Sequence, residues 1–214
     1  EDARRRDFTM NALYADLNGM VLDPLGGLDD LNARRVRFID DPDQRIREDY
    51  LRILRFFRFF AWYGDQNAGL DPDGLAACAD NLDGLAQLSR ERVGAEMLKL
   101  LGAPDPSQAV VAMAQSGVLA RVLPGTTSQA LPILVHLEGD MPPDPLRRLA
   151  SLGGEDVAKM LRLSKSDARY LSDVRKAIET QMPPLEAGYR LGLQKARDIV
   201  LLRAAMFEQP VAPA

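Results

Sequence analysis

The sequence predicts a mainly α-helical protein that begins with a small mixed α/β segment. Two observations lead to this fold class. From residue 43 to residue 207, apolar side chains recur at the spacing of amphipathic helices, and Pro-rich breaks at 103–106, 141–145 and 182–184 separate the helical stretches. Before residue 43, short apolar runs flank an Asn-Gly pair, which is typical of a β-hairpin.

The mixed segment contains three predicted elements. The Asn-Gly pair lies between the apolar runs 8–15 and 20–25, so a hairpin is expected there. A short helix is expected over 28–34, followed by a strand over 36–39, where the sequence reads Val-Arg-Phe-Ile. We interpret this segment as the edge of a larger α/β domain.

The helical part opens with a long helix that runs from Asp43 to about Tyr63 and ends at Gly64. Ser89 is expected to cap a later helix, because its hydroxyl can accept a hydrogen bond from a free backbone N–H group. The residues after 208 are expected to form a disordered tail, 209–214. The helices expected after Gly64 span 72–80, 82–87, 89–101, 107–116, 128–138, 144–150, 154–162, 166–180 and 185–207.

Residues 45–61 are the most informative segment. At about 100° per residue, a continuous helix here separates a charged stripe from an apolar stripe that is expected to be buried. Carboxylates and guanidinium groups one turn apart can pair with a nucleobase edge or hold phosphates. The alternative is an exposed helix held by ion pairs worth roughly 0.2–0.5 kcal/mol each. The charged stripe holds Arg45, Glu48, Asp49, Arg52 and Arg55, and the apolar stripe holds Tyr50, Ile53, Leu54, Phe57 and Ala61.

The composition argues against several classes of protein. No apolar run approaches the ~20 residues of a membrane-spanning helix, so no membrane partner is expected. The single cysteine, Cys78, forms no internal disulfide, which fits a cytoplasmic protein, and its apolar context predicts a buried helix residue. His136 is the only histidine, so no metal site is expected around it.

Four motifs follow one another in the first part of the chain. They read RRRDFTMNA at 4–12, DPLGGLDDL at 23–31, EDYLRILR at 48–55 and SRERVGAE at 89–96. In this order and at these intervals, the chain resembles the class II tRNA nucleotidyltransferases (CCA-adding enzymes) and the similar bacterial poly(A) polymerases. The resemblance covers residues 2–125 and fades after that.

The resemblance implies an enzyme that adds CMP and AMP to the tRNA 3′ end without a template, with ATP and CTP as substrates and Mg²⁺ as cofactor. In the family, an Asp-x-Asp pair on a strand supplies the catalytic carboxylates. The two such sequences here, at 41–43 and 71–73, contain proline and lack β-branched flanks, so turns or helix starts are expected. We therefore expect a fragment without the N-terminal catalytic half, without catalytic or metal-binding residues of its own, and inactive in isolation.

The resemblance also assigns nucleotide-binding roles to residues of the first motif. The aspartate of the motif, Asp7, is expected to bind the ribose hydroxyls of the incoming nucleotide. Arg5 and Arg6 are expected to lie near its triphosphate, which suits the donor geometry of a guanidinium group.

In the charged stretch, the resemblance implies that Asp49 and Arg52 pair with the Watson–Crick edges of CTP and ATP. A carboxylate accepts from the exocyclic amine that both bases carry, and it repels the O6 acceptor of guanine. Arg55 is expected to reach a phosphate, and Glu48 is expected to orient Arg52.

The motif at 89–96 matches a Glu-Arg-x-x-x-Glu element, here Glu91, Arg92 and Glu96, that is expected to support the nucleotide-selecting helix from behind. After Arg55 the family usually has a small residue, whereas this chain has Phe56 and Phe57. By helical angle Phe56 and Phe59 lie near the charged stripe, where they could stack on a base or pack against the absent head, and head packing is favoured. This packing predicts an exposed apolar patch and some self-association in this chain.

Basic side chains are concentrated after residue 141, although the net charge is −4. One cluster lies in a predicted helical stretch, where it is a candidate for contact with an RNA backbone. A solvated helix face is the alternative. The cluster consists of Lys159, Arg162, Lys165, Arg169, Arg175 and Lys176.

We expect four regions: a head remnant (1–42), a helical neck with the nucleotide-selecting helix (43–103), a helical RNA-binding body (104–208) and the tail (209–214). CCA addition is the favoured function. A poly(A) polymerase, and a non-catalytic helical RNA-binding or interaction module, remain alternatives. CTP use and product length distinguish the first two, and charges paired internally on the nucleotide-selecting helix would favour the third.

Overall fold

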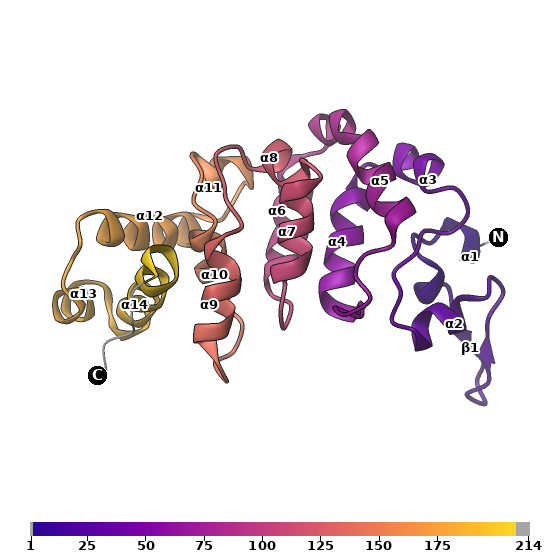
Figure 1. Ribbon diagram of the computed structural model, residues 1–214, viewed down its shortest axis with the longest axis horizontal. Coiled ribbons are helices and arrows are strands. Elements are labelled where there is room, and N and C mark those ends of the chain that lie inside the picture. The colour runs from indigo at the N-terminus through magenta and orange to yellow at the C-terminus, as the bar shows by residue number, and fades with distance from the viewer. Residues whose placement is uncertain (1, 209–214) are drawn as a thin grey trace.

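The computed structural model describes residues 2–208, in which helices follow one another in a row from a small N-terminal hairpin to α13 at the far end (Figure 1). The mainly helical fold class is therefore confirmed. No helix in residues 2–208 is long and apolar enough to cross a membrane. The tail expected at 209–214 lies outside the described residues.

The N-terminal segment contains the expected hairpin, although it is short. Tyr14 pairs with Leu22 and Ala15 with Val21, and the Asp16 carboxylate accepts hydrogen bonds from the turn. The prediction of a strand at 36–39 is wrong. Within residues 2–208 it has no strand to pair with, and only a single bridge joins Phe38 to Phe8. The elements are α1 (Asp2–Arg5), a 3-10 turn η1 (Thr9–Asn11), β1 (Tyr14–Ala15), β2 (Val21–Leu22) and α2 (Gly27–Asn32).

Helix α2 packs directly against the first motif. A Cβ atom on Gly27 would lie 2.0 Å from the carbonyl oxygen of Thr9, so only glycine permits this approach. The fully buried Asp30 accepts a hydrogen bond of 2.5 Å from the Thr9 hydroxyl. Its carboxylate also receives the Nε atoms of Arg35 at 2.8 Å and Arg37 at 3.0 Å. These contacts hold the backbone beside Asp7 in place.

The helix expected from Asp43 to Tyr63 is interrupted at Asp49, so the prediction of one continuous helix is wrong. Asp49 has an extended backbone, with φ −154° and ψ 105°. One of its carboxylate oxygens accepts a hydrogen bond of 3.1 Å from the Leu51 backbone N–H, and its carbonyl accepts the N–H of Arg52 at 3.0 Å. Asp49 thus satisfies free N–H groups at the start of a second helix, as capping residues do. The helices of this region are α3 (Pro42–Glu48), α4 (Leu51–Tyr63), α5 (Pro72–Asp80), η2 (Leu82–Gln87) and α6 (Arg90–Leu101).

The remaining helices agree with the predicted order, with two differences. The short helix α8 was not expected, and the segment predicted as one helix over 185–207 breaks at Gly192, whose φ of 91° favours glycine. The predicted boundary at 42 coincides with the start of α3, and the one at 103 with the loop after α6, but the division into domains stays a prediction. These helices are α7 (Ser107–Gln115), α8 (Val118–Val122), α9 (Ala130–Glu138), α10 (Pro145–Ser151), α11 (Val157–Met160), α12 (Lys165–Glu179), α13 (Pro184–Leu191) and α14 (Leu193–Phe207).

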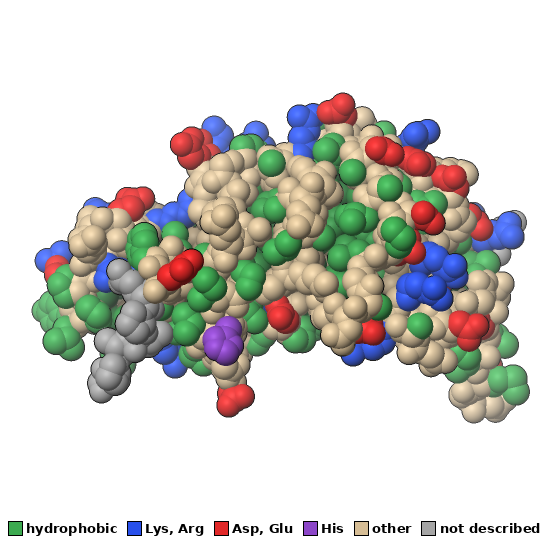
Figure 2. Space-filling model, in the orientation of Figure 1, with side chains coloured by type: hydrophobic (Ala, Val, Ile, Leu, Met, Phe, Trp, Pro, Cys, Tyr) green, Lys and Arg blue, Asp and Glu red, His purple; other side chains and the backbone are tan. Residues whose placement is uncertain are grey.

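Aromatic side chains join the N-terminal segment to α4. Phe56 is fully buried and stacks on Phe38 with ring centroids 5.4 Å apart, and Phe59 packs on Phe8 at 4.8 Å. The prediction of an exposed apolar patch at Phe56 and Phe59 is therefore wrong, because Phe38 and Phe8 cover them. Exposed apolar side chains lie instead at the hairpin and at the α13 end, at the lower right and the left of Figure 2, with Leu17 and Tyr189 among them. Self-association stays a prediction.

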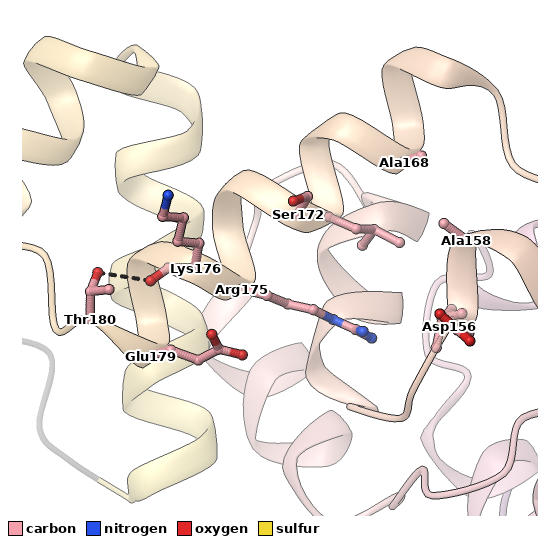
Figure 3. Close-up of a pocket in the computed structure, with 10 residues that line it drawn as sticks. Asp156, Ala158, Ala168, Ser172, Arg175, Lys176, Glu179 and Thr180 are labelled. Atoms are coloured by element: carbon pink, nitrogen blue, oxygen red, sulfur yellow. Dashed lines mark hydrogen bonds between the residues drawn. The ribbon is translucent and has the colours of Figure 1, made fainter.

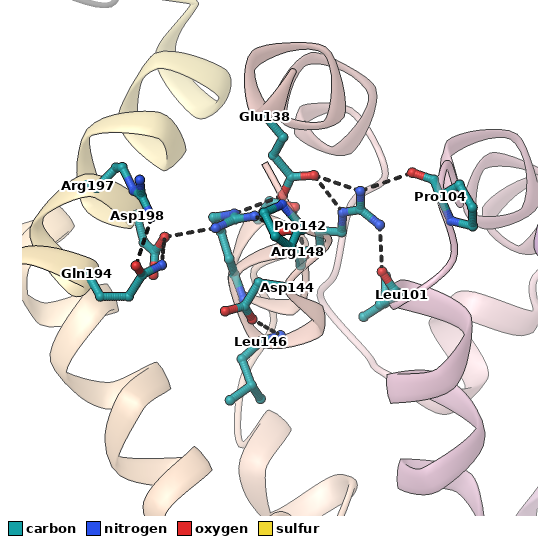
Figure 4. A network of polar contacts seen from close by, with 12 residues as sticks. Leu101, Pro104, Glu138, Pro142, Asp144, Leu146, Arg148, Gln194, Arg197 and Asp198 are labelled. Carbon is teal, nitrogen blue, oxygen red and sulfur yellow. Dashed lines mark hydrogen bonds and ion pairs between the residues drawn. The ribbon is translucent and has the colours of Figure 1, made fainter. Parts of the chain in front are cut away.

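A buried cluster of charges connects α6, α9, α10 and α14 (Figure 4). Glu138 receives the Nε atoms of Arg147 at 2.8 Å and Arg148 at 2.9 Å. Arg147 also donates to Asp198 at 3.0 Å. Arg148 donates to the carbonyl of Leu101 at 2.8 Å, at the C-terminal end of α6. No spacing in the sequence indicates this cluster, because it connects four separate helices.

Candidate functional site

The candidate site forms where the first motif meets α4. The carboxylate of Asp7 receives Arg52 Nε at 2.9 Å on one oxygen and Arg55 Nε at 2.5 Å on the other. Arg52 lies on the first turn of α4 and Arg55 on the next, so both guanidinium groups reach the same carboxylate. The Asp7 side chain is 12% exposed. Three predicted nucleotide-binding residues are thus brought together, while their roles stay predictions.

Arg52 is held by acceptors on several sides. Besides Asp7, its Nη1 donates to Glu48 and to the carbonyl of Arg45, both at 2.6 Å. Its Nη2 has a single acceptor among the described residues, the carbonyl of Arg5 at 3.4 Å. A guanidinium group has five N–H donors, so one on Nη2 remains for another acceptor. Arg52 is therefore fixed in orientation while part of its donor edge is unused.

Glu48 and Arg45 form the next layer of contacts. Glu48 contacts Arg52, as expected, and also pairs with Arg45, which in turn donates to the carbonyl of Arg6. The hydrogen bond from Arg52 lowers the pKa of Glu48, with smaller contributions from the charges of Arg45 and Arg52. Arg45 stood on the predicted charged stripe, yet it is buried and had no assigned role. Its buried side chain contacts the Arg6 carbonyl, 39 positions away in the sequence, which helical spacing does not indicate.

Asp49 lies beside this cluster but pairs with a different helix. Its second carboxylate oxygen is 2.6 Å from Arg92 Nη2 on α6. The Asp49 side chain is 36% exposed and that of Arg92 is 50% exposed, so solvent reaches this pair. The continuous stripe inferred from helical spacing is thus divided: Asp49 faces α6, while Arg52 and Arg55 face Asp7.

Two of the three expected residues in the motif at 89–96 contact Asp49 or α4. Arg92 pairs with Asp49, and the buried Glu96 receives Arg58 Nε at 2.6 Å. The prediction that Glu91 supports the nucleotide-selecting helix is wrong. On α6 its side chain is rotated by about 100° from Arg92 and pairs instead with Arg162 at 3.4 Å, with both groups largely in solvent.

The two arginines that precede Asp7 act through their backbone in this arrangement. The carbonyl of Arg5 accepts from Arg52, and the carbonyl of Arg6 accepts from Arg45. Both side chains are exposed, and that of Arg6 points to Asp2 at 3.4 Å and lies over the Tyr14 ring. Their expected place near a triphosphate stays a prediction.

Five of the six residues in the basic cluster predicted for RNA contact are exposed, and the sixth, Arg175, is half-buried. Lys165, Arg169 and Lys176 are exposed and share one face of α12. Lys159 and Arg162 are also exposed, at α11 and just after it.

Arg175 differs from the other members of the cluster. It lines a groove of about 540 Å³ between α11 and α12, where it reaches toward the segment that carries Asp156 while Lys176 points away (Figure 3). Its guanidinium group donates to the carbonyls of Gly154 at 2.9 Å and Gly153 at 2.5 Å. Burial lowers its pKa. Two of its donors are thus engaged with the protein itself, and its contact with an RNA backbone stays a prediction.

Within residues 2–208, no three acidic, histidine or cysteine side chains gather in a way that would hold a metal ion. The carboxylates of the candidate site are each paired with arginine, which would oppose a cation. The residues present therefore do not fit the Mg²⁺ that the resemblance implies.

Two family models match the chain. The model described as "Poly A polymerase head domain" matches residues 1–37, and the one described as "Probable RNA and SrmB-binding site of polymerase A" matches residues 69–129. Among curated relatives, the CCA-adding enzyme of Geobacillus thermodenitrificans is 41% identical over 239 residues, covering 100% of this chain and 55% of the relative. The mouse mitochondrial CCA tRNA nucleotidyltransferase 1 is 35% identical over 198 residues, covering 86% of this chain and 45% of the relative.

The fold is also similar to that of a solved structure. The CCA-adding enzyme of Bacillus stearothermophilus in complex with CTP superimposes with a TM-score of 0.72 at 28% identity, covering 100% of this chain and 56% of that one. The chain spans about half the length of the curated relatives it matches.

Proposed function

We propose that this chain, which belongs to the family of CCA-adding enzymes and poly(A) polymerases, carries the nucleotide-selecting part of an enzyme that adds CMP and AMP to the 3′ end of tRNA. Catalytic carboxylates and Mg²⁺ would come from a nucleotidyltransferase head, since the described residues offer no such cluster. We also propose that the protein works in the cytoplasm, on the basis of its single, buried cysteine.

The observation that carries this proposal is the arrangement of Asp49 and Arg52. The Arg52 backbone N–H donates to the Asp49 carbonyl, so the two residues lie within one turn at the start of α4. The Asp49 carboxylate would face a base beside the Arg52 guanidinium group once it turns from Arg92. A base that offers both an amine and a ring acceptor, as cytosine and adenine do, satisfies this pair. Uracil and guanine present a carbonyl to the carboxylate, which leaves polar groups unpaired and disfavours binding.

The contacts of Arg52 favour selection by a prearranged site. Asp7, Glu48 and two carbonyls hold the guanidinium group before a nucleotide arrives, so binding does not have to order a long side chain. Binding would require Asp49 to leave or share its contact with Arg92, and the exposure of both side chains makes that exchange possible.

The interaction-module alternative is favoured by one observation, because the charges on α4 are paired internally. The exposure of the charged groups at the edge of the site argues against the interaction-module alternative. The side chains of Glu48, Asp49 and Arg92 are 41%, 36% and 50% exposed, whereas purely structural pairs such as Arg147–Glu138 are 2% exposed on both sides. A poly(A) polymerase remains the second candidate function, since one matching family model is described by that activity. Binding of CTP separates the two.

The test is nucleotide binding to this chain, followed by calorimetry and by NMR of the Arg52 side-chain Nε–H. CTP and ATP are expected to bind more tightly than UTP and GTP. Asp49→Asn keeps the shape of the side chain but removes its charge, so the preference is expected to fall by about tenfold. Arg52→Ala is expected to abolish it.

The matched control is Arg47→Ala, which removes an exposed arginine of α3 that pairs with Asp43 away from the site. It is expected to leave the preference unchanged. Equal binding of all four nucleotides, or a preference that survives both Asp49→Asn and Arg52→Ala, would contradict the proposal. Preference for ATP over CTP would favour the poly(A) polymerase.

A further inference from the structure

We propose that the C-terminal half of α4 is a stacking platform for the unpaired bases of an RNA 3′ end. Its core is the row Phe59, Tyr63 and Trp62. The ring centroids of Phe59 and Tyr63 are 5.5 Å apart, and those of Tyr63 and Trp62 are 6.5 Å apart. Neighbouring aromatic side chains of this kind bind unpaired nucleic acid because every base has a face that can stack.

The platform is continuous with the candidate site. Arg55, Phe59 and Tyr63 follow one another at intervals of four residues, so they lie on one face of the helix. The guanidinium carbon of Arg55 lies 5.8 Å from the Phe59 ring centroid, and the same guanidinium group pairs with Asp7. The row thus leads from the nucleotide-selecting end of α4 to its other end, about 16 Å away at 1.5 Å per residue.

The two outer aromatic side chains are exposed yet held in place. Trp62 is 40% exposed and its indole Nε1 donates to the carbonyl of Lys99 at 2.8 Å. Tyr63 is 46% exposed and lies edge-on to Phe59. An indole that is fixed by its N–H while its ring remains accessible loses little conformational freedom when a base stacks on it.

Cationic groups border the platform, as contact with phosphates requires. Arg34 Nε donates to the carbonyl of Tyr63 at 3.2 Å, and its remaining donors are exposed. The Lys99 side chain is 61% exposed, and its nearest carboxylate, Glu96 at 3.4 Å, also pairs with Arg58. The acidic Asp65 lies close by, with its backbone N–H on the Arg34 carbonyl at 2.9 Å. These contacts leave two cations beside the rings, which favours a polyanion.

This inference rests on the proposed function, because an RNA 3′ end has reason to lie here only if the next nucleotide is selected by Asp49 and Arg52. The nucleotides that precede the growing end would then stack on the exposed rings of Tyr63 and Trp62, which Phe59 supports from within the fold.

Trp62 is the only tryptophan of the chain, so its fluorescence reports directly on the platform. A short oligoadenylate is titrated into the full chain, and Trp62 emission is recorded together with the anisotropy of a dye on the RNA. Quenching of Trp62 that saturates with the anisotropy change is expected, and a duplex of the same length is expected to quench it far less. Tyr63→Leu keeps an apolar side chain without a stacking face, so it should weaken oligoadenylate binding about tenfold.

Two variants serve as controls. Tyr63→Phe retains the ring and should retain the affinity. Tyr189→Leu removes a tyrosine that is 93% exposed on α13, and it should change nothing. Binding seen by anisotropy without quenching of Trp62, or equal affinity in Tyr63→Leu and the unmodified chain, would overturn the inference and leave this surface to a protein partner.

The nucleotide measurements separate this inference from the function on which it rests. Tyr63→Leu should keep the preference for CTP and ATP. If oligoadenylate quenches Trp62 but the chain shows no nucleotide preference, the proposed function fails while the platform stands.

Discussion

Glu138→Gln should destabilise the protein more than any exposed charge removal, because it unbalances a buried cluster. The cluster holds two guanidinium groups, Arg147 and Arg148, and two carboxylates, Glu138 and Asp198, with side-chain exposures of 0–2%. Glu138 pairs with both arginines at 2.7–2.9 Å. The neutral amide keeps the shape but leaves one positive charge without compensation in a site shielded from water. Breaking a buried pair in this way costs about 3–5 kcal/mol.

The assay is urea denaturation followed by circular dichroism, from which the free energy of unfolding is extrapolated. The control is Glu186→Gln, which removes a carboxylate that pairs with Arg190 on α13, where the two side chains are 39% and 62% exposed. That change should cost about 0–1 kcal/mol. If Glu138→Gln costs no more than Glu186→Gln, the cluster does not contribute as argued. The result bears on the site, because Arg148 also holds the end of α6, the helix that carries Arg92.

Three further predictions concern other parts of the fold. Gly27→Ala should lower the free energy of unfolding by roughly 1–3 kcal/mol, since the new Cβ would meet the Thr9 carbonyl at 2.0 Å; an unchanged urea midpoint would contradict this close approach. Burial alone would raise the pKa of Asp30, but hydrogen bonds from one threonine and two arginines lower it below 3.8. The ionised Asp30 carboxylate therefore stabilises the folded protein above about pH 4, and this contribution is lost as the pH falls through the pKa of Asp30 in the folded state. Asp30→Asn should therefore flatten the loss of stability below about pH 4, whereas Asp29→Asn, an exposed neighbour, should not. Burial raises the pKa of the Cys78 thiol, so a thiol reagent should react with it at the rate of unfolding; fast labelling of the folded protein would show that the thiol is accessible.

The local features of the fold could be predicted from the chain itself. Ser89 caps α6 and accepts the Arg92 N–H at 3.3 Å, and Cys78 is buried on α5. The hairpin turn and the order of most helices also agree with the prediction, apart from the breaks at Asp49 and Gly192 and the additional helix α8. Each of these depends on residues within a few positions of one another, where capping groups, turn residues and helical spacing act over short distances.

The residues of the candidate site were also visible in the sequence, but their partners were not. Asp7 and Arg52 are 45 positions apart, and Asp49 and Arg92 are 43 positions apart. Helical spacing placed Asp49 and Arg52 on one stripe of one helix. The helix instead breaks at Asp49, because this carboxylate caps the following N–H groups and pairs with α6, which outweighs the gain from one more helical turn.

Tertiary packing alone decided which charged groups leave the solvent. Arg45, Arg147, Arg148 and Arg175 look like ordinary surface residues in the sequence, yet each is buried or half-buried with its donors on distant carbonyls or carboxylates. Phe56, expected at an exposed patch, is covered by Phe38. A side chain's periodicity shows the direction in which it leaves its own helix, whereas the groups that desolvate it and pair with it come from segments that only the folded chain brings together.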